Sequence, residues 1–145
     1  MRVDAGEPWV ASFAAGGIGG ITGVYACPSP TDLCVVSDGS AYIVDVRHPE
    51  HGAATPLAQV SQVMPIRGRP LLLLARMTDL VAVGAAGIEW RTRRLCLDGL
   101  AVVSATHEAI RCTGEFLGEM RDPAVDPATG ERAEGPPLPV GWPDE

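Results

Sequence analysis

Histidines, cysteines and arginines are the residues of this 145-residue sequence that could bind a metal, act as nucleophiles or bind an acidic group. His48, Glu50 and His51 stand close together, and neutral imidazole and carboxylate groups are common metal ligands. They fall in a predicted turn, however, where no helix would align the two imidazole rings. Ordinary polar turn residues explain the cluster, so we predict no metal site.

The four cysteines could supply a nucleophile. None of them forms a Cys-x-x-Cys pair, and Cys34, Cys96 and Cys112 sit in apolar runs, where a thiol behaves as a small buried hydrophobic group. Cys34 or Cys112 could still meet His107 in the fold and create a hydrolase site, because catalytic partners meet in space. The sequence contains no assembled catalytic motif, so a hydrolase is the alternative, and we predict no catalytic residue.

The strongest candidate for binding follows a tryptophan. Trp90 is followed by Arg91 and Arg93, which would share one face of a strand and could hold an acidic or aromatic group. A solvated outer strand whose charges discourage edge pairing explains the same residues without a function. We expect a binding surface to combine this strip with the turns at Asp38 and Asp79, because recognition usually occurs in loops on a rigid sheet.

Glycines dominate an uncharged stretch near the start of the sequence. Residues 17–23 lack the following helix that a phosphate-binding loop needs, so we predict no nucleotide cofactor. Residues 8–31 contain many glycines and no leucine, which argues against a membrane span. Close approaches of the backbone explain the glycines.

The elements that would position these residues are short strands. Strand signals occur at 33–36, 41–44, 71–74, 80–83, 88–92, 100–103 and 109–112. The Asp38-Gly39 pair between the first two runs predicts a tight hairpin. Several runs are apolar on successive residues, which is typical of strands covered on both faces. Residues 57–64 also fit a helical stripe, so a short helix remains open there.

A similar corner recurs with a period of about forty residues. Val44-Asp45, Val83-Gly84 and Val125-Asp126 are each followed by a turn that contains glycine and then by a more polar segment. We therefore divide a single domain, residues 1–145, into units at about 21–59, 60–98 and 99–139. Residues 135–145 are rich in proline and are expected to be irregular.

The segment 125–131, Val-Asp-Pro-Ala-Thr-Gly-Glu, resembles the strand-turn-strand corner of quinoprotein-type β-propeller blades. The segment 83–90, with Gly87 and Trp90, looks like a degenerate copy. The resemblance implies an all-β fold of about twelve short antiparallel strands in three four-stranded propeller-like repeats, with a β-trefoil or a β-sandwich as alternatives. Three blades are too few to close a ring, so either two chains complete one or the array stays open.

Charge and composition limit the partners. The formal net charge is −7, which disfavours nucleic acid and anionic membranes and suits a basic protein partner. The absence of lysine and asparagine is typical of a GC-rich bacterial genome, and no export signal is visible, so we expect a cytoplasmic bacterial protein. The sequence thus favours a non-enzymatic protein-interaction module without a cofactor, of immunity or regulatory type, which could form a homodimer.

Overall fold

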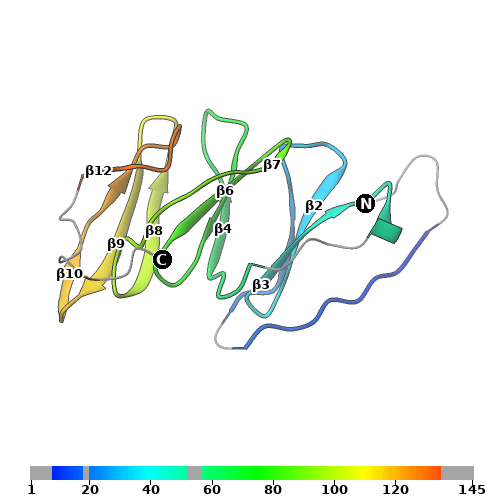
Figure 1. Ribbon diagram of the computed structural model, residues 1–145, viewed down its shortest axis with the longest axis horizontal. Coiled ribbons are helices and arrows are strands. Elements are labelled where there is room, and N and C mark those ends of the chain that lie inside the picture. The colour runs from blue at the N-terminus through cyan, green and yellow to red at the C-terminus, as the bar shows by residue number, and fades with distance from the viewer. Residues whose placement is uncertain (1–7, 18–19, 52–56, 135–145) are drawn as a thin grey trace.

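The chain folds into three antiparallel β-sheets. The computed structural model describes residues 8–17, 20–51 and 57–134. Figure 1 shows the sheets one after another along the long axis, in the order of the chain. The helical structure in these ranges is a single 3-10 turn, η1 (Pro49–His51). The predicted all-β class is therefore confirmed, and the sheets in these ranges form an open row.

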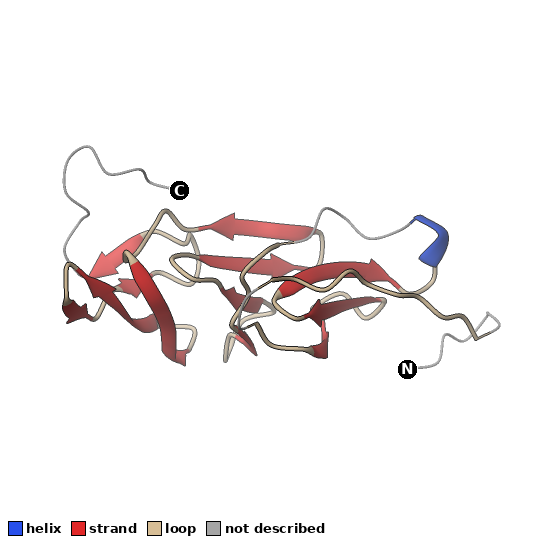
Figure 2. Ribbon diagram, turned by 90° about the horizontal axis from the view of Figure 1, so that it is seen from below, coloured by secondary structure: helices blue, strands red, loops and turns tan. Residues whose placement is uncertain are grey.

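Each sheet is built from consecutive strands. The first sheet contains β1 (Gly23–Ala26), β2 (Asp32–Ser37) and β3 (Ser40–Asp45). The middle sheet contains β4 (Gln62–Pro65), β5 (Leu72–Ala75), β6 (Leu80–Gly84) and β7 (Gly87–Arg91). The third sheet contains β8 (Asp98–Ala105), β9 (Ile110–Phe116), β10 (Glu119–Arg121), β11 (Ala124–Val125) and β12 (Arg132–Glu134). Figure 2 shows the same strands from below.

The number of strands differs from the predicted four in two of the sheets. In the third sheet, β9 is long enough for one edge to pair with β11 at Ile110 and with β10 at Phe116, which adds a fifth strand. In the first sheet three strands are described, and Leu57 pairs with Ala41 beyond β3 as an isolated bridge. Among the residues that the structure describes, only the middle sheet has the predicted four strands.

The hairpin between β2 and β3 turns as its sequence predicts. Asp38 and Gly39 both have positive φ angles, 44° and 85°, which is the geometry of a two-residue turn that matches the twist of paired strands. Gly39 packs against the backbone of Gly20 so closely that a Cβ there would lie 3.1 Å from the Gly20 Cα. The turn therefore also anchors the glycine-rich segment that precedes β1.

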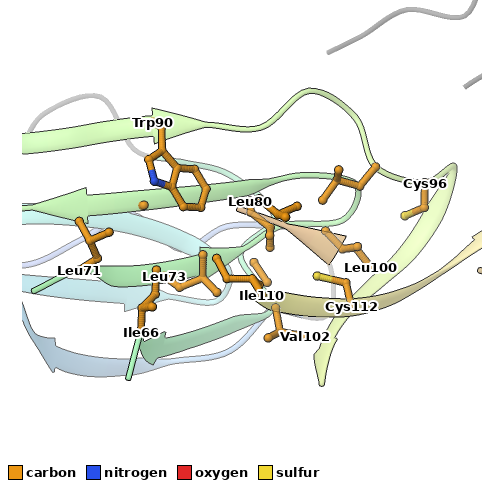
Figure 3. Packing of buried hydrophobic residues seen from close by; sticks show 14 residues of the cluster. Ile66, Leu71, Leu73, Leu80, Trp90, Cys96, Leu100, Val102, Ile110 and Cys112 are labelled. Carbon is orange, nitrogen blue, oxygen red and sulfur yellow. The ribbon is translucent and has the colours of Figure 1, made fainter. Parts of the chain in front are cut away.

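The two central strands of the middle sheet, β5 and β6, are buried on both faces. Alternate residues of β5 and β6 face the first sheet and form a cluster with Cys34, Val36, Ala41 and Val60: Leu72, Leu74, Val81 and Val83. The intervening residues pack against the third sheet: Leu73, Ala75, Leu80 and Ala82 (Figure 3). The prediction of strands covered on both faces is confirmed for these two strands, and it explains why their sequences are apolar throughout.

Residues 57–64 form no helix. Val63 packs on the cluster beside the first sheet and Met64 on the cluster beside the third sheet, so successive side chains point to opposite faces. This alternation requires an extended chain, and 62–65 is accordingly strand β4. The possible helix was wrong because the apolar residues serve two cores rather than one helical stripe.

The N-terminal segment lies along the first sheet. The Tyr42 hydroxyl donates a hydrogen bond of 2.9 Å to the Ala14 carbonyl, and the rings of Phe13 and Tyr42 are 5.1 Å apart. A cavity of about 320 Å³ lies between this segment and β3, and it is lined in part by Trp9 and Pro49. No helix in the described ranges is long and apolar enough to cross a bilayer. The predicted irregular tail, 135–145, lies outside these ranges.

Candidate functional site: an arginine pocket between the middle and third sheets

One wall of the site is the segment that connects the middle sheet to the third. After β7 the chain crosses through residues 92–97, held by two backbone hydrogen bonds: Thr92 N–H to the Leu80 carbonyl at 2.9 Å, and Leu95 N–H to the Thr78 carbonyl at 2.8 Å. Thr92 and Leu95 are buried, whereas Arg93 is exposed. The backbone thus fixes the point from which the arginine side chain extends.

The opposite wall is the turn between β11 and β12. The Asp126 carbonyl accepts the Gly130 N–H at 2.8 Å, and the Asp126 carboxylate accepts the Ala128 N–H at 2.8 Å. Gly130 has a φ of 75°, in the left-handed region that favours glycine. Asp and Gly therefore close this turn in the manner that their sequence positions predict.

Trp90 joins the two walls. Its side chain is buried, and the indole Nε1–H donates a hydrogen bond of 3.0 Å to the Pro127 carbonyl. A Cβ added to Gly130 would lie 2.6 Å from the indole ring, so only a glycine lets the turn approach this closely. The tryptophan of the middle sheet thus docks on the turn of the third sheet, and this contact sets the width of the space between them.

Four arginines surround that space. The pocket holds about 230 Å³ and is lined by Arg91, Arg93, Arg94, Leu95, Thr129, Gly130, Glu131 and Arg132. The whole sequence has only eleven arginines and no lysine. A concentration of guanidinium groups in an otherwise acidic chain favours an anion as the ligand, because guanidinium matches carboxylate and phosphate geometry.

Asp79 holds one of these arginines in place. Its carboxylate is almost fully buried, and its Oδ2 accepts hydrogen bonds from Arg91 Nη2 at 3.1 Å and Arg91 Nε at 3.3 Å. Arg76 Nη1 lies 3.5 Å from the same oxygen. A buried carboxylate is tolerated when it is paired in this way. Asp79 therefore orients Arg91 rather than facing a ligand itself.

Replacing Asp79 with asparagine is expected to lower the free energy of unfolding by about 2 kcal/mol, because Arg91 and the mostly buried Arg76 lose their shared counter-charge. Urea denaturation of the two proteins measures the difference. Asp122→Asn, at an exposed position, is the matched control and is expected to change stability by less than about 0.5 kcal/mol. Equal effects at the two positions would contradict the assigned role of Asp79.

The structure brings together most of the residues predicted for binding. Arg91 and Arg93 line the pocket, although β7 ends at Arg91 and the two therefore do not belong to one strand face. Asp79 lies behind Arg91, and Trp90 packs between the sheets instead of lining the pocket. Asp38 belongs to the hairpin of the first sheet, where its N–H bonds to the Thr22 hydroxyl at 3.0 Å.

Several pocket residues were missed from the sequence: Arg94, Thr129, Glu131 and Arg132. Thr129 and Glu131 flank Gly130 in the segment 125–131, which resembles a blade corner, and Arg132 follows it directly, so the pairing of that corner with Trp90 could have indicated these three residues. Arg94 also follows Trp90 in the sequence, but on a strand it would not share the face of Arg91 and Arg93, and only the crossing of the chain between the sheets places it here.

The cysteines are poor nucleophiles. Burial raises the pKa of the Cys34 and Cys112 thiols to about 12 and that of Cys27 to about 11. All four cysteines are free thiols. A thiol with such a pKa is protonated at neutral pH, and the thiolate is the reactive form.

A thiol reagent at pH 8 is therefore expected to label Cys34 and Cys112 at least about 100-fold more slowly in the folded protein than in urea. The thiol pKa is 9.0 when unperturbed and higher in the folded state, so the unfolded chain loses these protons first. Their contribution to stability is complete below pH 9 and is lost as the pH rises toward 12. Mass spectrometry of labelled peptides measures the rates, and similar rates in both states would contradict the burial.

The histidines do not assemble a metal site with other side chains that the structure describes. His48 Nδ1 lies 3.3 Å from Glu50 Oε1 on the surface, and the His51 side chain lies outside the described part. His107 is exposed in the turn before β9. Over the described ranges no group of three histidine, cysteine, aspartate or glutamate side chains converges as metal ligands do.

Comparison of the chain with protein-family models, with curated proteins and with solved structures finds no match.

Proposed function

We propose that this protein is a non-enzymatic, propeller-like interaction module that holds an acidic group of a protein partner in the arginine pocket. The observation that carries the proposal is the convergence of four arginines, contributed by β7, by the crossing segment 92–97 and by β12, on one pocket of about 230 Å³. The pocket has walls fixed by backbone hydrogen bonds and by the docking of Trp90. A preformed site of this kind binds with a smaller loss of conformational entropy than a flexible surface.

The propeller-like part of the proposal is supported by the equivalent places of the three corners. Asp45 ends β3, Gly84 ends β6 and Asp126 follows β11, and each of these strands is third in the path through its sheet. A fourth strand follows the second and third corners. Sheets stacked face to face in chain order are the arrangement that blades have in a propeller.

A homodimer remains part of the proposal, because an open array leaves a face of an end sheet without a neighbouring sheet. On the first sheet the cross-strand neighbours Val24, Val35 and Tyr42 form an apolar row, and Val24 is 63% exposed. A second copy could cover part of this row. Light scattering at high concentration tests this element, and a strictly monomeric species would remove it without affecting the pocket.

The alternative of a small hydrolase has less support. It requires a reactive thiol beside a histidine, whereas burial keeps Cys34 and Cys112 protonated and His107 lies in an exposed turn. Within the part of the chain that the structure describes, no hydrogen bond joins a cysteine to a histidine. The binding proposal requires neither a reactive thiol nor a cysteine–histidine pair.

Whether an acidic group can bind depends on the charges close to the pocket more than on the net charge of the whole chain. The overall charge of −7 disfavours acidic partners at a distance, but such repulsion is screened beyond about 8 Å at physiological salt. A partner that places one acidic group in the pocket and a basic surface against the rest of the chain suits both the arginines of the pocket and the overall negative charge of the chain. We therefore propose that this chain is a cytoplasmic protein of immunity or regulatory type and that its protein partner carries both acidic and basic groups.

Capture from a bacterial lysate tests the proposal when three forms of the full chain are compared. The forms are the unchanged protein, the double variant Arg93→Glu with Arg132→Glu, and the control Arg47→Glu, whose arginine lies at the end of β3 beside Asp45. We expect a protein that the unchanged chain and the control retain and the double variant loses. The same proteins on all three forms, or none on any, would overturn the proposal.

A further inference from the structure

We infer that the cavity on the first sheet is a groove for a proline-rich peptide, and that its occupant is the segment 136–143 of a second copy of this chain. The inference rests on the homodimer that forms part of the proposed function, since it names the segment and the groove that hold the two copies together. It does not involve the arginine pocket.

The groove lies on the face of the first sheet that is turned away from the middle sheet. Ala41 and Ile43 of β3 pack on the cluster shared with the middle sheet, so Tyr42 and Val44 point to the opposite face. Residues 8–17 run along that face at the end of the row of sheets, and the cavity of about 320 Å³ lies between them and β3 (Figure 1). Pockets for ligands begin at roughly 300 Å³, so this one has room for one or two side chains of a peptide.

Aromatic rings form much of the groove. The sequence has three tryptophans, two tyrosines and two phenylalanines, and three of these residues, Trp9, Phe13 and Tyr42, line this one cavity. Trp9 is 38% exposed, and the hydrogen bond from the Tyr42 hydroxyl to the Ala14 carbonyl holds the segment over the sheet. None of the residues that line the cavity is charged. Uncharged grooves lined by aromatic rings are typical sites for proline-rich peptides in the polyproline II conformation, which is largely preformed and loses little entropy on binding.

The sequence itself contains a peptide of this kind. Residues 136–143 read Pro-Pro-Leu-Pro-Val-Gly-Trp-Pro, with four prolines and no charged residue. Each proline fixes its own φ angle near the polyproline II value, so a segment of this composition favours that conformation. Trp142 adds a large apolar side chain that gains free energy when an aromatic cavity removes it from water. The segment therefore suits the groove in charge and in shape.

The position of the segment in the chain selects a second copy as its source. It follows β12 of the third sheet, which lies at the opposite end of the row from the groove (Figure 1). Stacked sheets are about 10 Å apart, whereas residues 135–142 extend by at most ~28 Å, which is too short to pass around the middle sheet and still lie along the groove. A second copy packed end to end brings its third sheet beside the groove. Exchange in both directions then joins two chains through two equal contacts.

Fluorescence anisotropy of a labelled peptide with the sequence of residues 134–145 tests the groove. The host is the full chain with Trp142→Ala, so that its own segment competes less for the site. We expect saturable binding that Trp9→Ala in the host weakens at least about tenfold. Val10→Ala is the matched control, because Val10 is 98% exposed and does not line the groove, and it should change the affinity less than about twofold. A peptide with alanine in place of its four prolines should bind at least about tenfold more weakly.

Sedimentation velocity of the full chain tests the second copy. The unchanged chain is expected to form a dimer as its concentration rises, and Trp9→Ala and Trp142→Ala should each weaken the dimer at least about tenfold. A mixture of the two variants should associate more strongly than either variant alone, because the intact segment of the first enters the intact groove of the second. Two substitutions that merely disturbed folding would not compensate each other in this way.

The outcomes separate this inference from the proposed function. No saturable binding of the peptide, or an equal loss in Trp9→Ala and Val10→Ala, would overturn the groove. A dimer that persists in Trp9→Ala and Trp142→Ala would overturn the inference and leave the homodimer intact, whereas a strictly monomeric chain would remove both. The double variant Arg93→Glu with Arg132→Glu should bind the peptide normally, so failure of the groove leaves the arginine pocket untouched.

Discussion

Replacing Trp90 with alanine is expected to lower the free energy of unfolding by about 4 kcal/mol, the largest effect of any single change considered. The substitution removes a buried indole from the cluster between the middle and third sheets, and it leaves the Pro127 carbonyl without its donor. Urea denaturation followed by far-ultraviolet circular dichroism measures the loss. The tryptophan fluorescence of the variant is not a suitable probe, because Trp90 itself contributes to that signal.

Two further variants separate the contributions of the indole. Trp90→Phe keeps an aromatic ring but not the hydrogen bond, and it is expected to lose about 2 kcal/mol. Gly130→Ala is also destabilising, because its Cβ would meet the ring and because its φ is positive. The combination of Gly130→Ala with Trp90→Ala should be clearly less damaging than the sum of the two changes. Additive losses would show that Trp90 and Gly130 are not coupled.

Leu73→Ala and Leu74→Ala are each expected to lower the free energy of unfolding by about 3 kcal/mol. The two residues are neighbours in β5 and are both fully buried, but they face different clusters. In a sheet with one solvent-exposed face, only one of the two substitutions would lower the free energy of unfolding strongly. Chemical denaturation of the two variants therefore tests the layered arrangement of the three sheets directly.

Leu117→Ala is the matched control, because Leu117 is 66% exposed in the turn after β9. It is expected to change stability by less than about 0.5 kcal/mol. If either Leu73→Ala or Leu74→Ala behaved like this control, one face of the middle sheet would have to be open to solvent, and the stacking of sheets would be wrong.

Local sequence patterns predicted the parts of the fold that depend on near neighbours. The Asp38-Gly39 turn followed from residue type, and the doubly covered β5 and β6 followed from unbroken apolar runs. β4 was ambiguous because its apolar residues pack against two separate cores. This packing depends on strands distant in the sequence and cannot be predicted from the segment alone. β10 was missed because two of its three residues are charged and it is held by pairing with β9.

The candidate site was only partly predictable for a similar reason. Arg91 and Arg93 were found because they follow Trp90 directly. Arg132 comes from a distant segment, and only the docking of Trp90 on the turn at Gly130 brings it to the same pocket. The burial of Asp79 was likewise not visible, because an aspartate in a turn is usually exposed and here it is covered by Arg91 and Arg76.

The position of the middle sheet has a consequence for how the molecule comes apart. Neither hydrophobic cluster is complete without β5 and β6, so melting those strands dissolves both clusters at once. The three layers should therefore unfold in a single cooperative transition, with equal calorimetric and van't Hoff enthalpies, although they have separate interiors. Amide protons of β5 and β6 should exchange only through this global opening, whereas those at the outer edges should exchange through smaller, local openings.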